Sequence, residues 1–116
     1  MGTHAIIAIE NLDKTFDATW CYWDGYPEYL GHMLQKYYTD EVTIRTLLRR
    51  GHISNLKQTI SESNFLTDLY KEETFDIYEN VSYEELVRIC KKTYSSYLYR
   101  FKDNTWTYAE TRPIFK

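Results

Sequence analysis

The side chains best suited to chemistry gather in one stretch, residues 20–31, which read WCYWDGYPEYLG. Asp24 and Glu28 are two carboxylates four positions apart, and such a pair could act in acid–base catalysis or hold a divalent metal ion. Trp23 and Tyr26 lie beside them and could anchor a protein partner or stack on a nucleobase. The stretch therefore admits three chemistries: protein recognition, nucleotide binding and metal-dependent hydrolysis or nuclease activity.

A corner between a strand and a helix is the predicted setting of these side chains. Asp24 and Gly25 make the turn, and Pro27 follows where a first helical residue tolerates proline. Backbone N–H groups at a helix N-terminus lack partners within the helix and can receive an anion. A purely structural interpretation stays open, in which Asp24 caps the helix, Gly25 supplies a special dihedral angle and Trp23 fills core.

Other routes to catalysis have weaker support in the sequence. His4, His32 and His52 lack the spacing of a zinc motif, and there is no Cys-x-x-Cys pair. Cys21 and Cys90 lie among apolar residues and are expected to be reduced, buried and without a disulfide. None of the four glycines belongs to a phosphate-binding loop. We therefore expect no metal and no cofactor.

Composition limits the remaining function classes. A net charge of −3 argues against generic nucleic-acid binding, which needs basic residues to neutralise phosphates. No window approaches the roughly 18 apolar residues of a membrane span, and the N-terminus lacks the pattern of a signal peptide. We therefore expect a cytoplasmic protein with no membrane segment. Aromatic residues make up 17% of the chain, including 12 tyrosines, and this excess favours a binding face.

Hydrophobic periodicity predicts the elements that hold the corner. Residues 3–10 are apolar on both faces, which is typical of a central strand in a covered sheet. Ser82 and Glu85 form a capping box, and Asp103-Asn104 is a two-residue hairpin turn. Residues 52–73 lack periodicity and are expected to be irregular. The expected elements are strands over 3–10, 15–23, 74–79, 95–102 and 105–110, and helices over 27–38, from Asp40 to Gly51, and over 83–93.

These elements have the order ββααβαββ, with residues 3–10 and 15–23 paired antiparallel. Helices on a mostly antiparallel sheet give an α+β fold. We expect about five strands covered by about three helices, in one domain that spans residues 1–116.

The segments MGTHAIIAIE, CYWDGYPEYLG, GHISNL and YLYRFKDNTWTY, in this order, resemble a family of small phage and prophage proteins. Members begin with MGTR and a strand, carry a WDGYP-x-x-x-G corner, and finish with an aromatic hairpin. The family corner falls on Trp23, Asp24, Gly25, Tyr26, Pro27 and Gly31. His4 stands where the family commonly has arginine, and Tyr22 where it often has histidine. The resemblance implies a bacteriophage source and no defined reaction.

Small phage proteins of this kind commonly act on the host by binding. We therefore expect a binding protein with no enzymatic activity, most concretely an anti-defence or host-takeover inhibitor that blocks a host protein. One alternative is a nucleotide-signal sponge at the corner, and another is a small metal-dependent hydrolase or nuclease that uses Asp24 and Glu28. The expected site residues are Trp23, Asp24, Gly25, Tyr26, Glu28, His4 and Tyr22.

Overall fold

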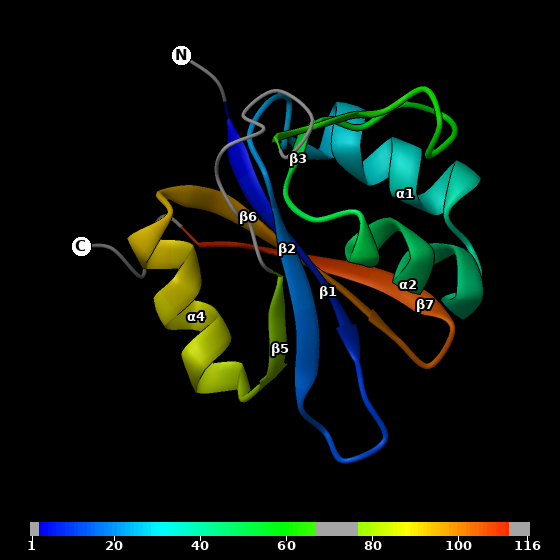
Figure 1. Cartoon of the computed structure of the whole chain (residues 1–116). Coiled ribbons are helices and arrows are strands. Elements are labelled where there is room, and N and C mark those ends of the chain that lie inside the picture. The colour runs from blue at the N-terminus through cyan, green and yellow to red at the C-terminus, as the bar shows by residue number, and fades with distance from the viewer. Residues whose placement is uncertain (1–2, 67–76, 112–116) are drawn as a thin grey trace.

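The described residues form one mixed sheet of seven strands, with helices against both of its faces (Figure 1). The computed structural model describes residues 3–66 and 77–111. The strands are β1 (His4–Glu10), β2 (Phe16–Cys21), β3 (Ile53–Asn55), β4 (Asn64–Phe65), β5 (Tyr78–Val81), β6 (Ser95–Lys102) and β7 (Thr105–Glu110). The helices are η1 (Pro27–Gly31), α1 (His32–Tyr37), α2 (Glu41–Arg49) and α4 (Tyr83–Lys92). The fold class is α+β, as the sequence predicts.

Strand order across the sheet is β4-β3-β2-β1-β6-β7, and β5 pairs with the first half of β2. The β1–β6 and β2–β3 pairs are parallel, and the other pairs are antiparallel. Within the described residues the sheet is therefore mostly antiparallel, as predicted, but the expected count of about five strands is wrong. The additional strands, β3 and β4, lie within residues 52–73. With three and two residues, they are too short to show a period.

β1 is central and buried on both faces, as its apolar pattern predicts. Ala5, Ile7 and Ile9 belong to a core shared with α1 and α2, whereas Ile6 and Ala8 belong to a second core under α4. Burial of a large aliphatic side chain contributes about 1.5–3 kcal/mol. The sheet is thus a common wall between two cores, and β1 is held from both sides.

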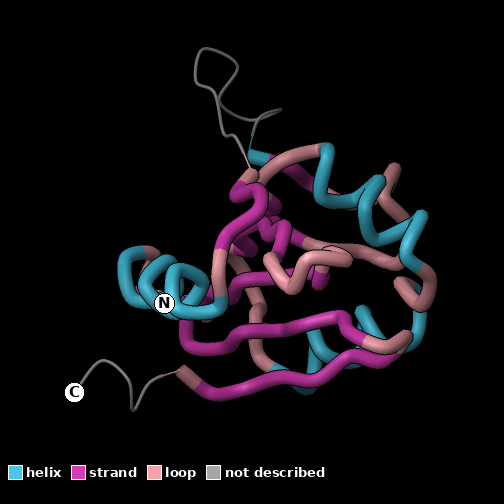
Figure 2. The backbone as a smooth tube through the Cα atoms, turned by 90° about the horizontal axis from the view of Figure 1, so that it is seen from below, coloured by secondary structure: helices cyan, strands magenta, loops and turns pink. Residues whose placement is uncertain are grey.

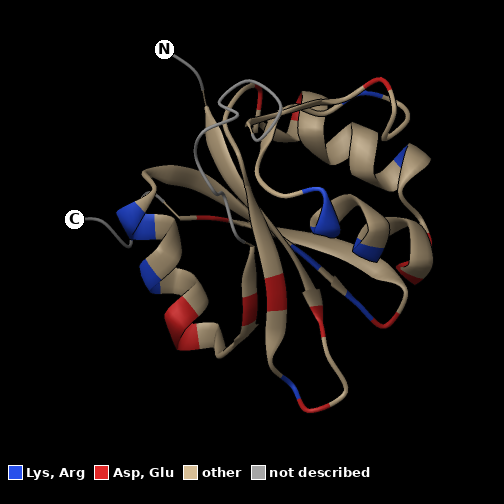
Figure 3. Cartoon of the chain, viewed as in Figure 1, with Lys and Arg blue, Asp and Glu red and all other residues tan. Residues whose placement is uncertain are grey.

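Two helices begin and end where the sequence predicts. Asp40 is the N-cap of α2, where its carboxylate accepts a hydrogen bond from the Thr43 N–H at 3.0 Å, and Gly51 follows the helix at φ 98°. The Ser82 hydroxyl caps α4 by accepting from the Glu85 N–H at 3.1 Å. Figure 3 shows acidic residues near the start of α4 and basic residues near its end, an arrangement that complements the helix dipole.

Two elements differ from their predicted form. The helix expected over 27–38 begins with a π-helical turn, η1, in which the His32 N–H reaches the Pro27 carbonyl five residues back. Regular α-helix follows only from His32. The strand expected over 74–79 is β5, which begins at Tyr78. Residues 74–76 lie outside the described residues.

β6 and β7 form the predicted hairpin, two neighbouring strands joined by a tight turn (Figure 2). Asp103 and Asn104 take φ of 52° and 62°, the left-handed conformation that this two-residue turn requires. Phe101 and Trp106 pack across the strands, with their ring centroids 5.2 Å apart. The hairpin therefore presents a fixed aromatic surface to η1 and α1, which together form the first helix.

Replacement of Ser82 by alanine tests the cap of α4. We expect Ser82→Ala to lower the free energy of unfolding by about 1 kcal/mol, because the Glu85 N–H loses its acceptor. Urea denaturation measures the change. Ser82→Asp is the control, since aspartate also caps helices and should retain the stability. An unchanged midpoint in Ser82→Ala would contradict the cap.

Both cysteines are buried and free, as predicted. Burial raises the pKa of Cys21 and of Cys90 from 9.0 to about 12. We expect neither thiol of the native protein to react with a thiol reagent at pH 8, whereas both should react after denaturation. The same pKa values predict a pH dependence of stability. As the pH rises above about 9, the thiols ionise in the unfolded chain while they remain protonated in the folded protein. The free energy of unfolding should therefore fall between pH 9 and pH 12. Rapid labelling of the folded protein would disprove the burial.

Candidate functional site

The corner between β2 and η1 is fastened to three other parts of the fold. The N–H groups of Tyr22 and Trp23 donate to carbonyls of residues 53 and 54 at 2.9 and 3.0 Å. The N–H of Gly25 donates to the Thr3 carbonyl at 2.8 Å, and the Tyr99 hydroxyl of β6 donates to the Gly25 carbonyl at 2.7 Å. The backbone of the corner is therefore held along most of its length.

Asp24 makes the bend and does not cap the helix. Its φ is 57°, a left-handed conformation that aspartate tolerates better than most residues. Tyr26 is the N-cap of η1, and its side chain makes no capping hydrogen bond. The interpretation of Asp24 as a cap is therefore wrong, because the N-cap position is Tyr26, two residues further along the chain.

Gly25 is needed for closeness and not for a special dihedral angle. A Cβ atom at this position would lie 2.8 Å from the Ala5 Cβ and 2.9 Å from the Thr3 carbonyl oxygen. Both distances are shorter than van der Waals contact. Only glycine lets the corner pass this near to β1 without a shift of the backbone.

Trp23 and Tyr26 are surface residues, with exposed fractions of 40% and 38%. The Trp23 ring packs edge-on against Tyr22, with centroids 4.8 Å apart, and Tyr22 stacks on His4 at 4.6 Å. His4 is oriented by its Nδ1–H, which donates to the Tyr22 carbonyl at 2.6 Å. The structure thus brings the rings of His4, Tyr22 and Trp23 into one aromatic cluster. The interpretation of Trp23 as a core residue is wrong, because the residue is 40% exposed.

The negative charge of Asp24 affects two ionisable side chains on the inner side of the corner, Cys21 and Tyr29. It raises the pKa of Cys21 and of Tyr29, in each case after the larger effect of burial. A thiol with a pKa near 12 is protonated at neutral pH, so Cys21 is unsuited to act as a nucleophile. The Tyr29 hydroxyl donates to the Leu56 carbonyl at 2.7 Å. Asp24 therefore combines a structural bend with a partly exposed charge.

Glu28 lies on a different surface, in a cavity of about 370 Å³ between the first helix and the hairpin. Helical residues His32 and Gln35 line one wall, and Tyr99 and Tyr108 line the other. Tyr99 is buried and Tyr108 packs against it at 5.7 Å, but Tyr108 remains 53% exposed and borders the cavity.

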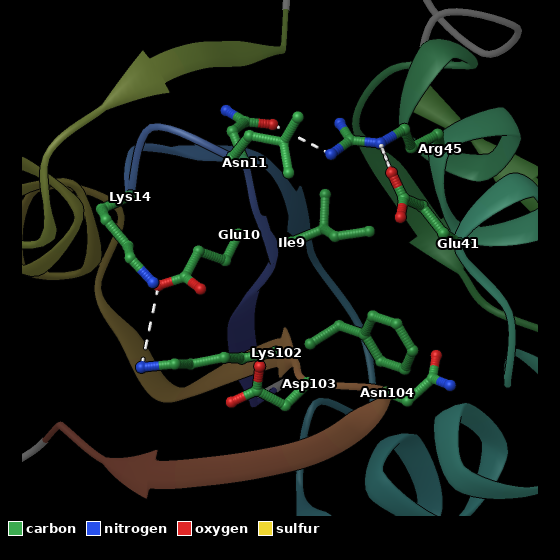
Figure 4. Close-up of a pocket in the computed structure, with 11 residues that line it drawn as sticks. Ile9, Glu10, Asn11, Lys14, Glu41, Arg45, Lys102, Asp103 and Asn104 are labelled. Carbon is green, nitrogen blue, oxygen red and sulfur yellow. Dashed lines mark hydrogen bonds and ion pairs between the residues drawn. The ribbon is translucent and has the colours of Figure 1, made fainter.

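A second cavity, of about 300 Å³, lies at the carboxyl ends of β1 and β6, the opposite end of β1 from the corner (Figure 4). Acidic and basic side chains line it in equal number. Arg45 bonds to Glu41 at 2.8 Å and to Asp17 at 3.2 Å, and Lys102 lies 3.8 Å from Glu10. Because these charged side chains pair with each other, we interpret them as stabilising this end of the sheet and not as a ligand-binding site.

Asp24 and Glu28, the proposed metal pair, belong to different surroundings, the inner corner and the cavity. In residues 3–66 and 77–111, no group of three or more His, Cys, Asp or Glu side chains is placed to hold a metal ion. None of the helices in the same residues is long and apolar enough to cross a membrane.

Two glycine substitutions test the closeness of the corner to β1. We expect Gly25→Ala to destabilise the protein by about 1–3 kcal/mol, because the new methyl group would overlap the backbone and side chain of β1. Gly31→Ala is the matched control, since its Cβ would lie 3.4 Å from Cε1 of the Tyr99 side chain. A Gly25→Ala protein as stable as the control would contradict this packing.

Comparisons with protein-family models, with curated proteins and with solved structures found no match.

Proposed function

We propose that this chain is a binding protein that recognises a protein partner through Trp23, Asp24 and Tyr26. The observation that supports this proposal most directly is the exposure of two large aromatic residues, Trp23 and Tyr26, each about two-fifths exposed. The backbone that carries them is held by hydrogen bonds to neighbouring segments. Tryptophan and tyrosine dominate interface hot spots. A fastened backbone reduces the conformational entropy lost on binding.

The surroundings of Trp23 also support an anchor role. Tyr22 packs against its ring and is itself stacked on His4, so the orientation of the Trp23 ring is restricted before a partner binds. Asp24 adds a negative charge beside it, and the chain as a whole has a net charge of −3. A partner with a basic rim around an apolar recess would complement this surface.

The specific form of the proposal comes from the family resemblance. A small phage accessory protein that blocks a host protein, as an anti-defence or host-takeover inhibitor, would act in the host cytoplasm. This form needs no catalytic residue, since occupation of the partner's surface is sufficient.

Affinity capture from host lysate, followed by a dissociation constant with the purified partner, tests the proposal. We expect Trp23→Ala and Tyr26→Ala each to weaken binding about thirtyfold, the effect of losing a hot-spot residue. Tyr94→Ala is the matched control, because Tyr94 is 78% exposed and lies after α4. All three variants should keep the wild-type melting temperature within a few degrees.

Asp24→Asn separates charge from shape. Asparagine tolerates the left-handed conformation as well as aspartate does, so the bend should persist. We expect unchanged stability and a tenfold or greater loss of affinity, the usual effect of removing a charge-assisted hydrogen bond. Wild-type affinity in Trp23→Ala, Tyr26→Ala and Asp24→Asn would place the recognition surface elsewhere.

A further inference from the structure

We propose that the cavity between the first helix and the hairpin is a second site, which binds a neutral planar nitrogen heterocycle of the nucleobase type. Its volume of about 370 Å³ falls in the range of small-ligand pockets. The site is separate from the protein-recognition surface proposed above, so each can fail without the other.

The floor of the cavity is aromatic and rigid. Tyr99 and Trp106 are nearly buried, and their polar atoms are already used: the Tyr99 hydroxyl bonds to the Gly25 carbonyl at 2.7 Å, and the Trp106 indole N–H bonds to the Tyr38 carbonyl at 2.8 Å. These two residues therefore offer the cavity ring surface alone. Tyr108, half exposed, adds a ring at the edge on which a planar ligand can stack.

The helical wall carries polar groups that the fold does not use. Glu28, His32 and Gln35 line the cavity, and within the described part of the chain none of their side chains makes a hydrogen bond or ion pair with another residue. The wall thus supplies a carboxylate, an imidazole and an amide that remain available to a ligand.

The local backbone supports a functional role for this wall. η1 is a π-helical turn, a rare conformation that is frequent at functional sites. Gly31 lies at its end, and a Cβ there would make an ordinary van der Waals contact of 3.4 Å with the Tyr99 ring. The polar wall therefore begins in a π-helical turn that packs beside the aromatic floor.

The charge of the lining selects the class of ligand. Glu28 carries the one carboxylate among the described residues that line the cavity, and none of these residues is a lysine or an arginine. Phosphate and carboxylate groups are therefore disfavoured. A heterocycle with N–H donors can bond to the Glu28 carboxylate, use the donor and acceptor of Gln35, and stack on tyrosine. These complementary edges favour a nucleobase over a methylated ammonium ion, which has no hydrogen-bonding edge.

Calorimetric titration of the full chain with four nucleosides (adenosine, guanosine, cytidine and uridine) tests the site. We expect saturable binding of at least one at submillimolar concentration, with no gain in affinity for its 5′-monophosphate. Glu28→Gln should weaken binding about tenfold by removing the charged acceptor, and Tyr108→Ala should weaken it by a similar factor by removing the stacking face. The matched controls Glu84→Gln and Tyr94→Ala alter exposed residues outside the cavity and should bind like the wild type.

Three results would overturn the proposal. One is the absence of saturable binding by any of the nucleosides at millimolar concentration. Another is saturable binding of choline in their place, which would assign the cavity to a methylated ammonium ion. The third is a nucleoside affinity that Glu28→Gln and Tyr108→Ala leave unchanged, which would place the ligand outside this cavity. Since Glu28 is exposed, Glu28→Gln is expected to fold even if Tyr108→Ala does not.

Discussion

A buried hydrogen bond between the Tyr99 hydroxyl and the Gly25 carbonyl joins two segments that are 74 positions apart in the chain. Burial raises the pKa of the Tyr99 phenol, so this group remains a donor at neutral pH. On its other side Gly25 donates to Thr3 at 2.8 Å. Displacement of this one residue would leave buried polar groups without partners, at a cost of about 1–3 kcal/mol each.

The same tyrosine connects the two surfaces proposed as sites. Its hydroxyl holds the corner that presents Trp23 and Tyr26, and its ring forms part of the floor of the cavity beside Glu28. One side chain therefore fixes the inner boundary of both surfaces. Preorganisation of this kind lowers the entropy that a bound partner or ligand must offset.

Local signals made much of the fold predictable from the sequence. The apolar residues of β1, the Ser82 cap and the Asp103-Asn104 turn each act within a few positions, and the structure confirms all three. Pairing between distant strands has no comparable signal. The parallel contact of β1 with β6 and the two short strands inside residues 52–73 therefore could not be predicted.

The corner was predictable from the sequence, but its arrangement was predictable only in part. The sequence places Trp23, Asp24 and Tyr26 in one corner between a strand and a helix, and they lie there in the structure. The conformations of Asp24 and Gly25 depend on how near β1 lies, which no local pattern encodes. The cavity escaped prediction for a related reason. It needs Glu28 from the helix and Tyr108 from the hairpin, and these meet only in the folded chain.

Strand order explains why the corner has this form. β1 lies between β2 and β6, so the chain that leaves β2 must cross the end of β1 before it reaches the side of β6. Gly25 marks the crossing, where it bonds to Thr3 before β1 and to Tyr99 of β6. The crossing uses the inward-facing groups of the backbone for hydrogen bonds and leaves no room for a side chain at its centre. The large residues on either side, Trp23 and Tyr26, are consequently left partly in solvent, so the constraint that closes the fold also produces the aromatic surface proposed to bind a partner.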